Sequence, residues 1–249
     1  MTSYNYTEDS YEKALIELFE EMGYQHIYGP DVDRNYRSPL YDSILEESIR
    51  SINSNEPEAA IEEALAKIRD FDNADLIRKN QVFTDYLQNG IEVAYYHRGE
   101  QQYTRIYLVD YKNVENNSFI IANQWTIVEN SEKRPDMIVF LNGLPVTLIE
   151  LKSPAREETD ASEGYKQIRN YIHEIPSVFI YNMICVISDM VTSKAGTITS
   201  DEDRFMAWKS VDGTVNHDQF ASFDVFFNGI FLKERLLDIL KNFICFSVN

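Results

Sequence analysis

Residues 134–154, RPDMIVFLNGLPVTLIELKSP, form the stretch that decides the fold of this chain. Two apolar runs flank an Asn-Gly pair, which is a strong short-range signal for a β-hairpin. Asp136, Glu150 and Lys152 stand in these runs, where a buried charge is costly unless it is paired, hydrogen-bonded or bound to metal. Two carboxylates and a lysine are also a minimal set for holding Mg²⁺ and cleaving a phosphodiester. The hairpin therefore predicts both core β-structure and a metal-dependent site.

The turn decides whether the three charged side chains share one face of the hairpin. Residues two apart in a strand share a face, so Glu150 and Lys152 do. A regular hairpin whose two-residue turn pairs Leu141 with Leu144 would put Glu150 on the face opposite Asp136. A three-residue loop makes Glu150 the diagonal neighbour of Asp136, at roughly 7–8 Å between Cα atoms, close enough for both carboxylates to share one cation. The site hypothesis therefore predicts the three-residue loop or an equivalent bulge.

The expected roles follow from charge and ligand chemistry. Asp136 and Glu150 are hard oxygen ligands that suit Mg²⁺, and the backbone carbonyl of Leu151 is a further candidate ligand. Lys152 is placed to orient an attacking water or to stabilise the negative charge that develops on the phosphate oxygens. The alternative is an ordinary surface hairpin with a Glu–Lys pair, because a three-residue pattern arises often by chance. The apolar setting and the Pro-Asp that opens the partner strand favour the site.

Composition limits the classes of protein to consider. The chain has 249 residues, 44% of them hydrophobic, which is typical of a globular protein with a sizeable core. No apolar run approaches the ~18 residues of a membrane-spanning helix, and the first residues lack the pattern of a signal peptide. Cys185 and Cys245 show no zinc-like spacing, so we expect free thiols in a cytoplasmic protein without membrane contact. The net charge of −18 argues against tight, autonomous binding to nucleic acid.

The pattern along the chain predicts a helical part followed by a mixed α/β core. Apolar stripes at helical spacing and suitable end residues predict helices at 8–22, 40–53, 57–71, 74–87, 161–174 and 233–242. Stretches rich in β-branched and aromatic residues predict strands at 91–97, 102–111, 119–128 and 177–187, besides the hairpin. We therefore expect a single α/β domain with a mixed central sheet flanked by helices.

The hairpin resembles the PD-(D/E)xK nuclease motif, in which Pro-Asp is followed by Glu-x-Lys. The longer text also resembles the N-terminal nuclease region of the motor (restriction) subunit of type I restriction enzymes. That resemblance covers nearly the whole chain and includes EKALIELFEEMGYQHIYGPD at 12–31, DRFMAWKSVDG at 203–213 and GIFLKERLLDILKNFICF at 229–246. It implies a restriction-endonuclease-like sheet flanked by helices, with Asp136, Glu150 and Lys152 as the catalytic set.

The resemblance also implies an activity, a cofactor and partners. The activity would be Mg²⁺-dependent cleavage of unmodified double-stranded DNA, coupled to ATP-driven translocation by later domains. Residues 1–90 would be the mainly helical part, 91–190 the catalytic core, and 191–249 a segment leading to an absent helicase (translocase) region. The specificity and modification (methyltransferase) subunits would be partners of the full-length protein. This sequence contains no G-x-x-x-x-G-K-[ST] motif, so we do not expect it to bind ATP itself.

Three further residues are candidates for a supporting role. Gln167 and Tyr171 share a helix face and match the Q-x-x-x-Y motif that follows the lysine in this nuclease branch, where the pair lies near the active site and DNA. The alternative for Tyr171 is a simple core aromatic. Glu12 matches a first-helix glutamate that contributes to the metal site, with Glu8 as its competitor and a solvated helix face as the alternative for either.

Two other functions remain open from the sequence. One is a non-catalytic nuclease-like module for DNA contact or subunit docking, although the intact Asp/Glu/Lys set argues against it. The other is a stand-alone DNA repair nuclease. A helicase encoded after Asn249 would favour the restriction-enzyme reading, and it would explain how an acidic chain cuts DNA that other parts hold.

Overall fold

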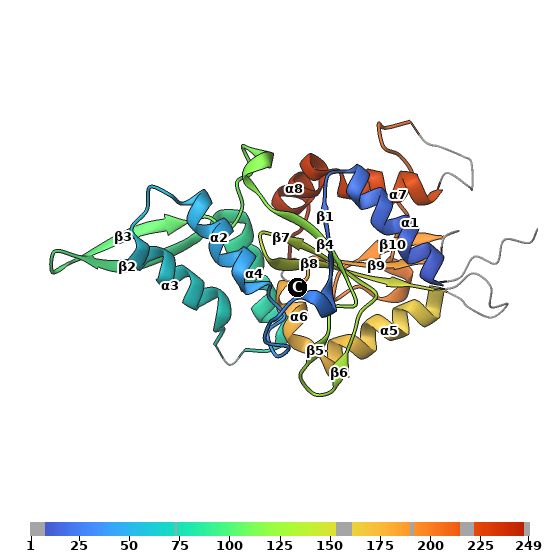
Figure 1. Ribbon diagram of the computed structural model, residues 1–249, viewed down its shortest axis with the longest axis horizontal. Helices are drawn as coiled ribbons and strands as arrows, with labels where there is room; N and C mark the ends of the chain where they lie inside the picture. Colours follow the sequence, from blue (N-terminus) through green and yellow to red (C-terminus); the bar gives the residue numbers. More distant parts are fainter. Residues whose placement is uncertain (1–7, 73, 153–160, 190–191, 215–221, 247–249) are drawn as a thin grey trace, which may run out of the picture.

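The computed structural model describes residues 8–72, 74–152, 161–189, 192–214 and 222–246. Its centre is a mixed six-stranded sheet in the order β1-β4-β7-β8-β9-β10, with β1 parallel to β4, β8 parallel to β9, and the other pairs antiparallel (Figure 1). Its strands are β1 (Gln25–Tyr28), β4 (Phe119–Asn123), β7 (Met137–Leu141), β8 (Leu144–Leu151), β9 (Ile184–Ser188) and β10 (Ser193–Gly196). The expected α/β class with a mixed central sheet flanked by helices is confirmed.

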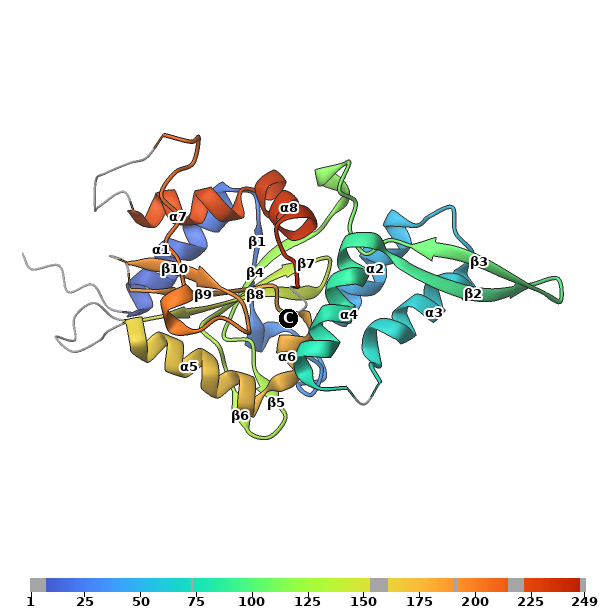
Figure 2. The same ribbon diagram turned by 180° about the vertical axis from the view of Figure 1, so that it is seen from behind.

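Helices cover both faces of this sheet (Figures 1 and 2). One face carries α1 (Glu8–Glu21), α7 (Ser222–Phe231) and α8 (Lys233–Asn242), and the other carries α5 (Ala161–Glu174) and α6 (Pro176–Tyr181). The central strands β7 and β8 are buried along their whole lengths, as expected for strands covered on both faces. No helix within the described ranges is both long and apolar enough to cross a membrane.

A side lobe extends from one end of the sheet. It contains α2 (Asp42–Ile52), α3 (Glu58–Arg69) and α4 (Leu76–Asn89), with the two-stranded ribbon of β2 (Ile91–His97) and β3 (Glu100–Ile106) reaching away from the body (Figure 2). A short ribbon of β5 (Ile127–Val128) and β6 (Glu132–Lys133) lies beside α5.

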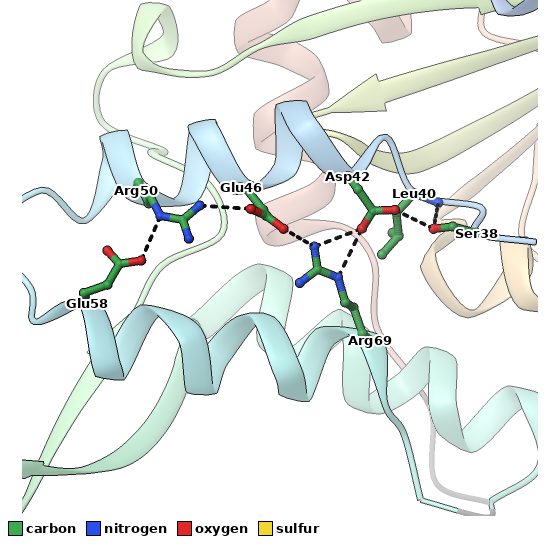
Figure 3. Close-up of polar contacts among 7 residues, drawn as sticks. All are labelled: Ser38, Leu40, Asp42, Glu46, Arg50, Glu58 and Arg69. Carbon is green, nitrogen blue, oxygen red and sulfur yellow. Dashed lines mark hydrogen bonds and ion pairs between the residues drawn. The ribbon is translucent and has the colours of Figure 1, made fainter. Parts of the chain in front are cut away.

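An ion-pair network ties α2 to α3 in this lobe (Figure 3). Arg69 contacts Asp42 at 2.9 Å and Glu46 at 2.8 Å, and Arg50 contacts Glu46 at 3.2 Å and Glu58 at 2.9 Å. All five side chains are more than a third exposed, so solvent screens each pair and its net stabilisation is small. The buried apolar residues between the helices supply most of the cohesion of the lobe.

Most predicted elements are present, and the exceptions lie among the predicted strands. Helices α5 and α8 have the predicted bounds, and the other predicted helices differ by only a few residues at their ends. The single strand predicted at 177–187 is wrong: Pro176 occupies the first turn of α6, and the strand begins only at Ile184. The strand predicted at 102–111 stops at Ile106, and the one predicted at 119–128 divides into β4 and β5. Strands β1, β6 and β10 and helix α7 have no counterpart among the predicted elements.

Candidate active site at one edge of the sheet

The candidate residues meet at one edge of the sheet because of its strand directions. The carboxyl ends of β1, β4, β8 and β9 and the first residue of β7 lie at the same edge, since Asn123 pairs with both Tyr28 and Met137, while Leu151 pairs with Ser188. Five strand ends therefore converge on the segment that carries Asp136 and on the end of β8.

The hairpin uses a two-residue turn together with a bulge. Leu141 pairs with Leu144, and both turn residues have positive φ angles of 52° and 77°, as a type I′ turn requires. Of the two predicted alternatives, the structure therefore does not use the three-residue loop. The equivalent bulge is present, because Val139 pairs with Thr147 while Phe140 pairs with Pro145, which leaves one extra residue in β8. A proline inside a central strand is the sequence signal for it, since proline cannot donate to the ladder and is confined to edges, strand starts and bulges.

The bulge turns the end of β8 to the other face of the sheet. Before it, Leu144 and Val146 pack in the cluster that contains the α1 side chains; after it, Leu148 packs in the cluster on the α5 face. Because side chains alternate along a strand, Glu150 and Lys152 follow Leu148 to the α5 face. Asp136 lies at the same edge, one residue before Met137. Because Met137 pairs with Ile149, the same register places Asp136 directly opposite Glu150. The predicted diagonal relation between the two carboxylates is replaced by a direct one.

Short polar contacts bind the three charged residues into one group. The backbone N–H of Leu151 donates to Oδ2 of Asp136 at 2.7 Å, and Lys152 Nζ donates to Oε1 of Glu150 at 2.5 Å. Glu150 is only 3% exposed, so the ammonium group of Lys152 offsets a large desolvation cost. The backbone N–H of Lys152 donates to the carbonyl of Ser188 at 2.8 Å, which fixes this end of β8 to β9.

Helix α5 brings the Q-x-x-x-Y pair to the same place. Tyr171 is 5% exposed, and its hydroxyl interacts with Glu150 and with the side chain of Gln167. Burial raises the pKa of the Tyr171 hydroxyl, the negative charges of Glu150 and Asp136 raise it further, and the hydrogen bond to Gln167 opposes the shift. The ring also packs in the hydrophobic core cluster, so Tyr171 is a core aromatic as well as a neighbour of the carboxylates.

Glu12 points to the edge of the sheet rather than to open solvent. Its Oε1 accepts a hydrogen bond from Nδ2 of Asn123 at 2.6 Å. Glu12 and Asp136 both line a groove of about 530 Å³ between α1, β1 and the end of β4, together with His26 and Tyr28. The side chain of its competitor Glu8 lies outside the described part of the structure.

The oxygen donors at this edge fit a hydrated Mg²⁺ ion. Asp136, Glu150 and the Leu151 carbonyl are oxygen donors on facing strand segments, and Mg²⁺ takes one or two carboxylates while keeping several waters. Among the residues that the structure describes, no three His, Cys, Asp or Glu side chains are grouped closely enough to hold a metal ion. Glu12 therefore does not complete a direct three-carboxylate set with Asp136 and Glu150.

Two residues at this edge, Asn123 and His26, are not among the predicted site residues. Asn123 closes an otherwise apolar strand, FIIAN at 119–123, and Lys152 likewise follows directly on the apolar end of β8, so a polar residue at a strand end is a usable signal. His26 hydrogen-bonds to Asn123 and lines the groove. Neither signal identifies a partner without the fold, because β4 is far from α1 and β1 in the sequence.

Comparison with known proteins gives consistent matches across the same region. Residues 5–204 match the family model described as "Type I restriction enzyme R protein N terminus (HSDR_N)". The chain is 31% identical over 254 residues to the "Type I restriction enzyme HindI endonuclease subunit" of Haemophilus influenzae, covering 96% of this chain and 24% of that protein. It is 31% identical over 151 residues to the "Type I restriction enzyme EcoprrI endonuclease subunit" of Escherichia coli, covering 57% of this chain and 46% of that protein. The chain thus spans about a quarter of the length of the Haemophilus protein.

Proposed function

Because the chain belongs to the family of type I restriction enzyme R protein N termini, we propose that it is a Mg²⁺-dependent endonuclease domain that hydrolyses phosphodiester bonds of unmodified double-stranded DNA. The observation that carries the proposal is the convergence of Asp136, Glu150 and Lys152 at one sheet edge, with Glu150 buried and paired. Burying a carboxylate costs desolvation free energy, and buried charged groups of this kind concentrate at functional sites.

Each residue has a proposed role in this reaction. Asp136, Glu150 and the carbonyl of Leu151 would hold the ion, which would supply Lewis-acid chemistry and lower the pKa of a bound water. Lys152 is within reach of the same carboxylate and stabilises negative charge that develops on the phosphate oxygens. Tyr171, through its contact with Glu150, orients that carboxylate.

Two more side chains have supporting roles in the proposal. Gln167 holds the hydroxyl of Tyr171 from the same helix. In this proposal Gln167 also contacts the DNA. Glu12 lines the groove beside Asp136. It acts at the site but does not bind the ion directly together with Asp136 and Glu150.

The net charge of −18 leads to a proposal about partners. An acidic domain gains little from phosphate contacts, which supply most of the affinity of ordinary DNA-binding proteins. We infer that an ATP-driven translocase on the same full-length polypeptide, with the specificity and modification subunits, holds the DNA in the cytoplasm, and that the nuclease domain binds only weakly. Weak intrinsic affinity would limit stray cutting.

The test is Lys152→Ala in the assembled restriction enzyme, with the exposed loop lysine variant Lys112→Ala as the matched control. We expect DNA cleavage to fall by about a hundredfold or more, as when a transition-state donor is removed, while ATPase and translocation rates stay at the wild-type level. The control should cut normally. Normal cleavage by Lys152→Ala would remove Lys152 from the mechanism and would refute the assignment of this site as the nuclease centre.

A further inference from the structure

A chain of hydrogen bonds runs from β1 through β4 to α1 at the edge of the site. His26 Nε2 lies 2.9 Å from Oδ1 of Asn123, and Nδ2 of Asn123 lies 2.6 Å from Oε1 of Glu12. Asn123 is 6% exposed, whereas the other side chains of β4 are apolar and buried. A buried carboxamide at this position is costly unless both of its ends are hydrogen-bonded, and here both ends are.

The direction of each hydrogen bond is fixed by chemistry. An ionised carboxylate only accepts hydrogen bonds, so Asn123 must present its NH₂ group to Glu12. The carboxamide oxygen then faces His26, whose Nε2 must carry the proton. By donating from Nε2, His26 holds the Asn123 amide in the orientation in which Asn123 donates to Glu12.

The fold places this chain of hydrogen bonds beside the proposed ion-binding residues. Asn123 pairs across the sheet with Met137, the residue after Asp136, and the backbone N–H of Gln124 donates to the carbonyl of Asp136 at 3.4 Å. Glu12, His26 and Asp136 line the same groove of about 530 Å³. The residue next to Glu12 on α1, Tyr11, is fully buried and its hydroxyl contacts Ser188 Oγ at the end of β9, so α1 is fixed on both sides of the hairpin.

We propose that Asn123 and His26 are positioning residues that hold the Glu12 carboxylate on the groove wall facing Asp136. The inference rests on the proposed nuclease function. Mg²⁺ keeps several waters when a protein binds it, and a carboxylate held at this wall accepts hydrogen bonds from such waters without ligating the ion. Unconstrained, the Glu12 side chain would sample several rotamers and would lose this effect.

The experiment measures binding of Mg²⁺ alone to the 249-residue chain by isothermal titration calorimetry, for wild type, Glu12→Gln, Asn123→Leu and the double variant. We expect each single variant to weaken Mg²⁺ binding by about tenfold, the lower end of the effect of removing an outer-shell partner. The double variant should bind Mg²⁺ as Glu12→Gln does, because Asn123 acts through Glu12. A merely structural role of Asn123 predicts instead that the two losses multiply, and that result would overturn the proposal.

A second series keeps the test valid if Asn123→Leu does not fold. His26→Leu removes the donor to Asn123 and should weaken Mg²⁺ binding, whereas His26→Gln retains an N–H donor and should restore it. His97→Leu, on the distant β2–β3 ribbon, is the matched control and should leave Mg²⁺ binding unchanged. Equal affinities for His26→Leu, His26→Gln and wild type would overturn the proposal, as would the absence of Mg²⁺ binding by the wild-type chain.

The two proposals fail in different ways. If Lys152→Ala cuts DNA at the wild-type rate, the assignment of this site as the nuclease centre falls whatever the Mg²⁺ affinities are. If Lys152→Ala is inactive but Asn123→Leu binds Mg²⁺ as tightly as wild type, only the positioning role falls.

Discussion

Gly143 lies in the turn of the β7–β8 hairpin. We expect its replacement by alanine to destabilise the fold by more than the left-handed backbone conformation alone would cost. Its φ angle is +77°, and a Cβ built on it would lie 2.5 Å from the backbone N of Leu45 and 2.6 Å from the carbonyl O of Tyr41. The carbonyl of Gly143 also accepts a hydrogen bond from the backbone N–H of Tyr41 at 2.9 Å. Gly143→Ala must therefore separate the hairpin from the start of α2.

The β2–β3 ribbon provides a matched control because it has the same kind of turn. Arg98 and Gly99 have φ angles of 52° and 84°, close to those of the β7–β8 turn, and a Cβ on Gly99 would meet nothing within 4 Å. Gly99→Ala therefore carries only the cost of a left-handed L-residue, roughly 1–2 kcal/mol. Gly143→Ala adds overpacking of roughly 1–3 kcal/mol and a weakened backbone hydrogen bond of similar cost. These terms overlap, so we expect a total of roughly 3–6 kcal/mol for Gly143→Ala.

The assay is urea unfolding at constant pH, followed by circular dichroism for wild type and both variants. We expect the midpoint to fall clearly more for Gly143→Ala than for Gly99→Ala, with the m-value unchanged. Destabilisations that agree within about 1 kcal/mol would refute the reasoning, because they would mean that the contact of Gly143 with α2 has no energetic weight.

Two further predictions follow from burial. The pKa of Tyr171 is raised in the folded chain above its ordinary value near 10, so its contribution to stability is complete below about pH 10 and is lost as the pH rises further. Tyr171→Phe should therefore reduce the alkaline loss of stability, by up to about 1.4 kcal/mol per pH unit above pH 10 in urea titrations; an unchanged pH slope would contradict this. Cys245 is exposed, whereas Cys185 is buried and burial raises its pKa to about 12. Ellman's reagent should modify Cys245 at once and Cys185 only at the rate of unfolding; two equally fast thiols would disprove the burial argument.

Local pattern was sufficient for the elements whose signals are continuous in the sequence. The helix at Ala161–Glu174 and the final helix at Lys233–Asn242 have strong apolar periodicity, and their bounds were predicted as observed. The error at 177–187 arose where a short apolar run fits a buried helix and a buried strand equally well, a choice that periodicity cannot make. Pro176 was the local signal that favours the helix at its start.

The candidate site, too, could be predicted from the sequence only in part. The sequence predicts that Asp136, Glu150 and Lys152 belong to the site and lie in one hairpin, because charged residues are unusual in apolar strands. The contact of Tyr171 with Glu150 follows from the packing of α5 on the sheet, and the link of Glu12 to Asn123 joins residues 111 positions apart. No local pattern encodes such a distance.

The sequence by itself determined the class of fold, the hairpin, the charged trio and the family resemblance, because each depends on residue type at short spacing. Only the tertiary structure decided which face of the sheet the trio occupies. That choice rests on the bulge in β8, and the turn beside it is fixed from far along the chain: Asn142 is fully buried and hydrogen-bonds to Leu108 and Asn117, while Gly143 lies against α2. A one-residue change of register reverses every side chain of a strand, and the local pattern of this hairpin allowed both registers.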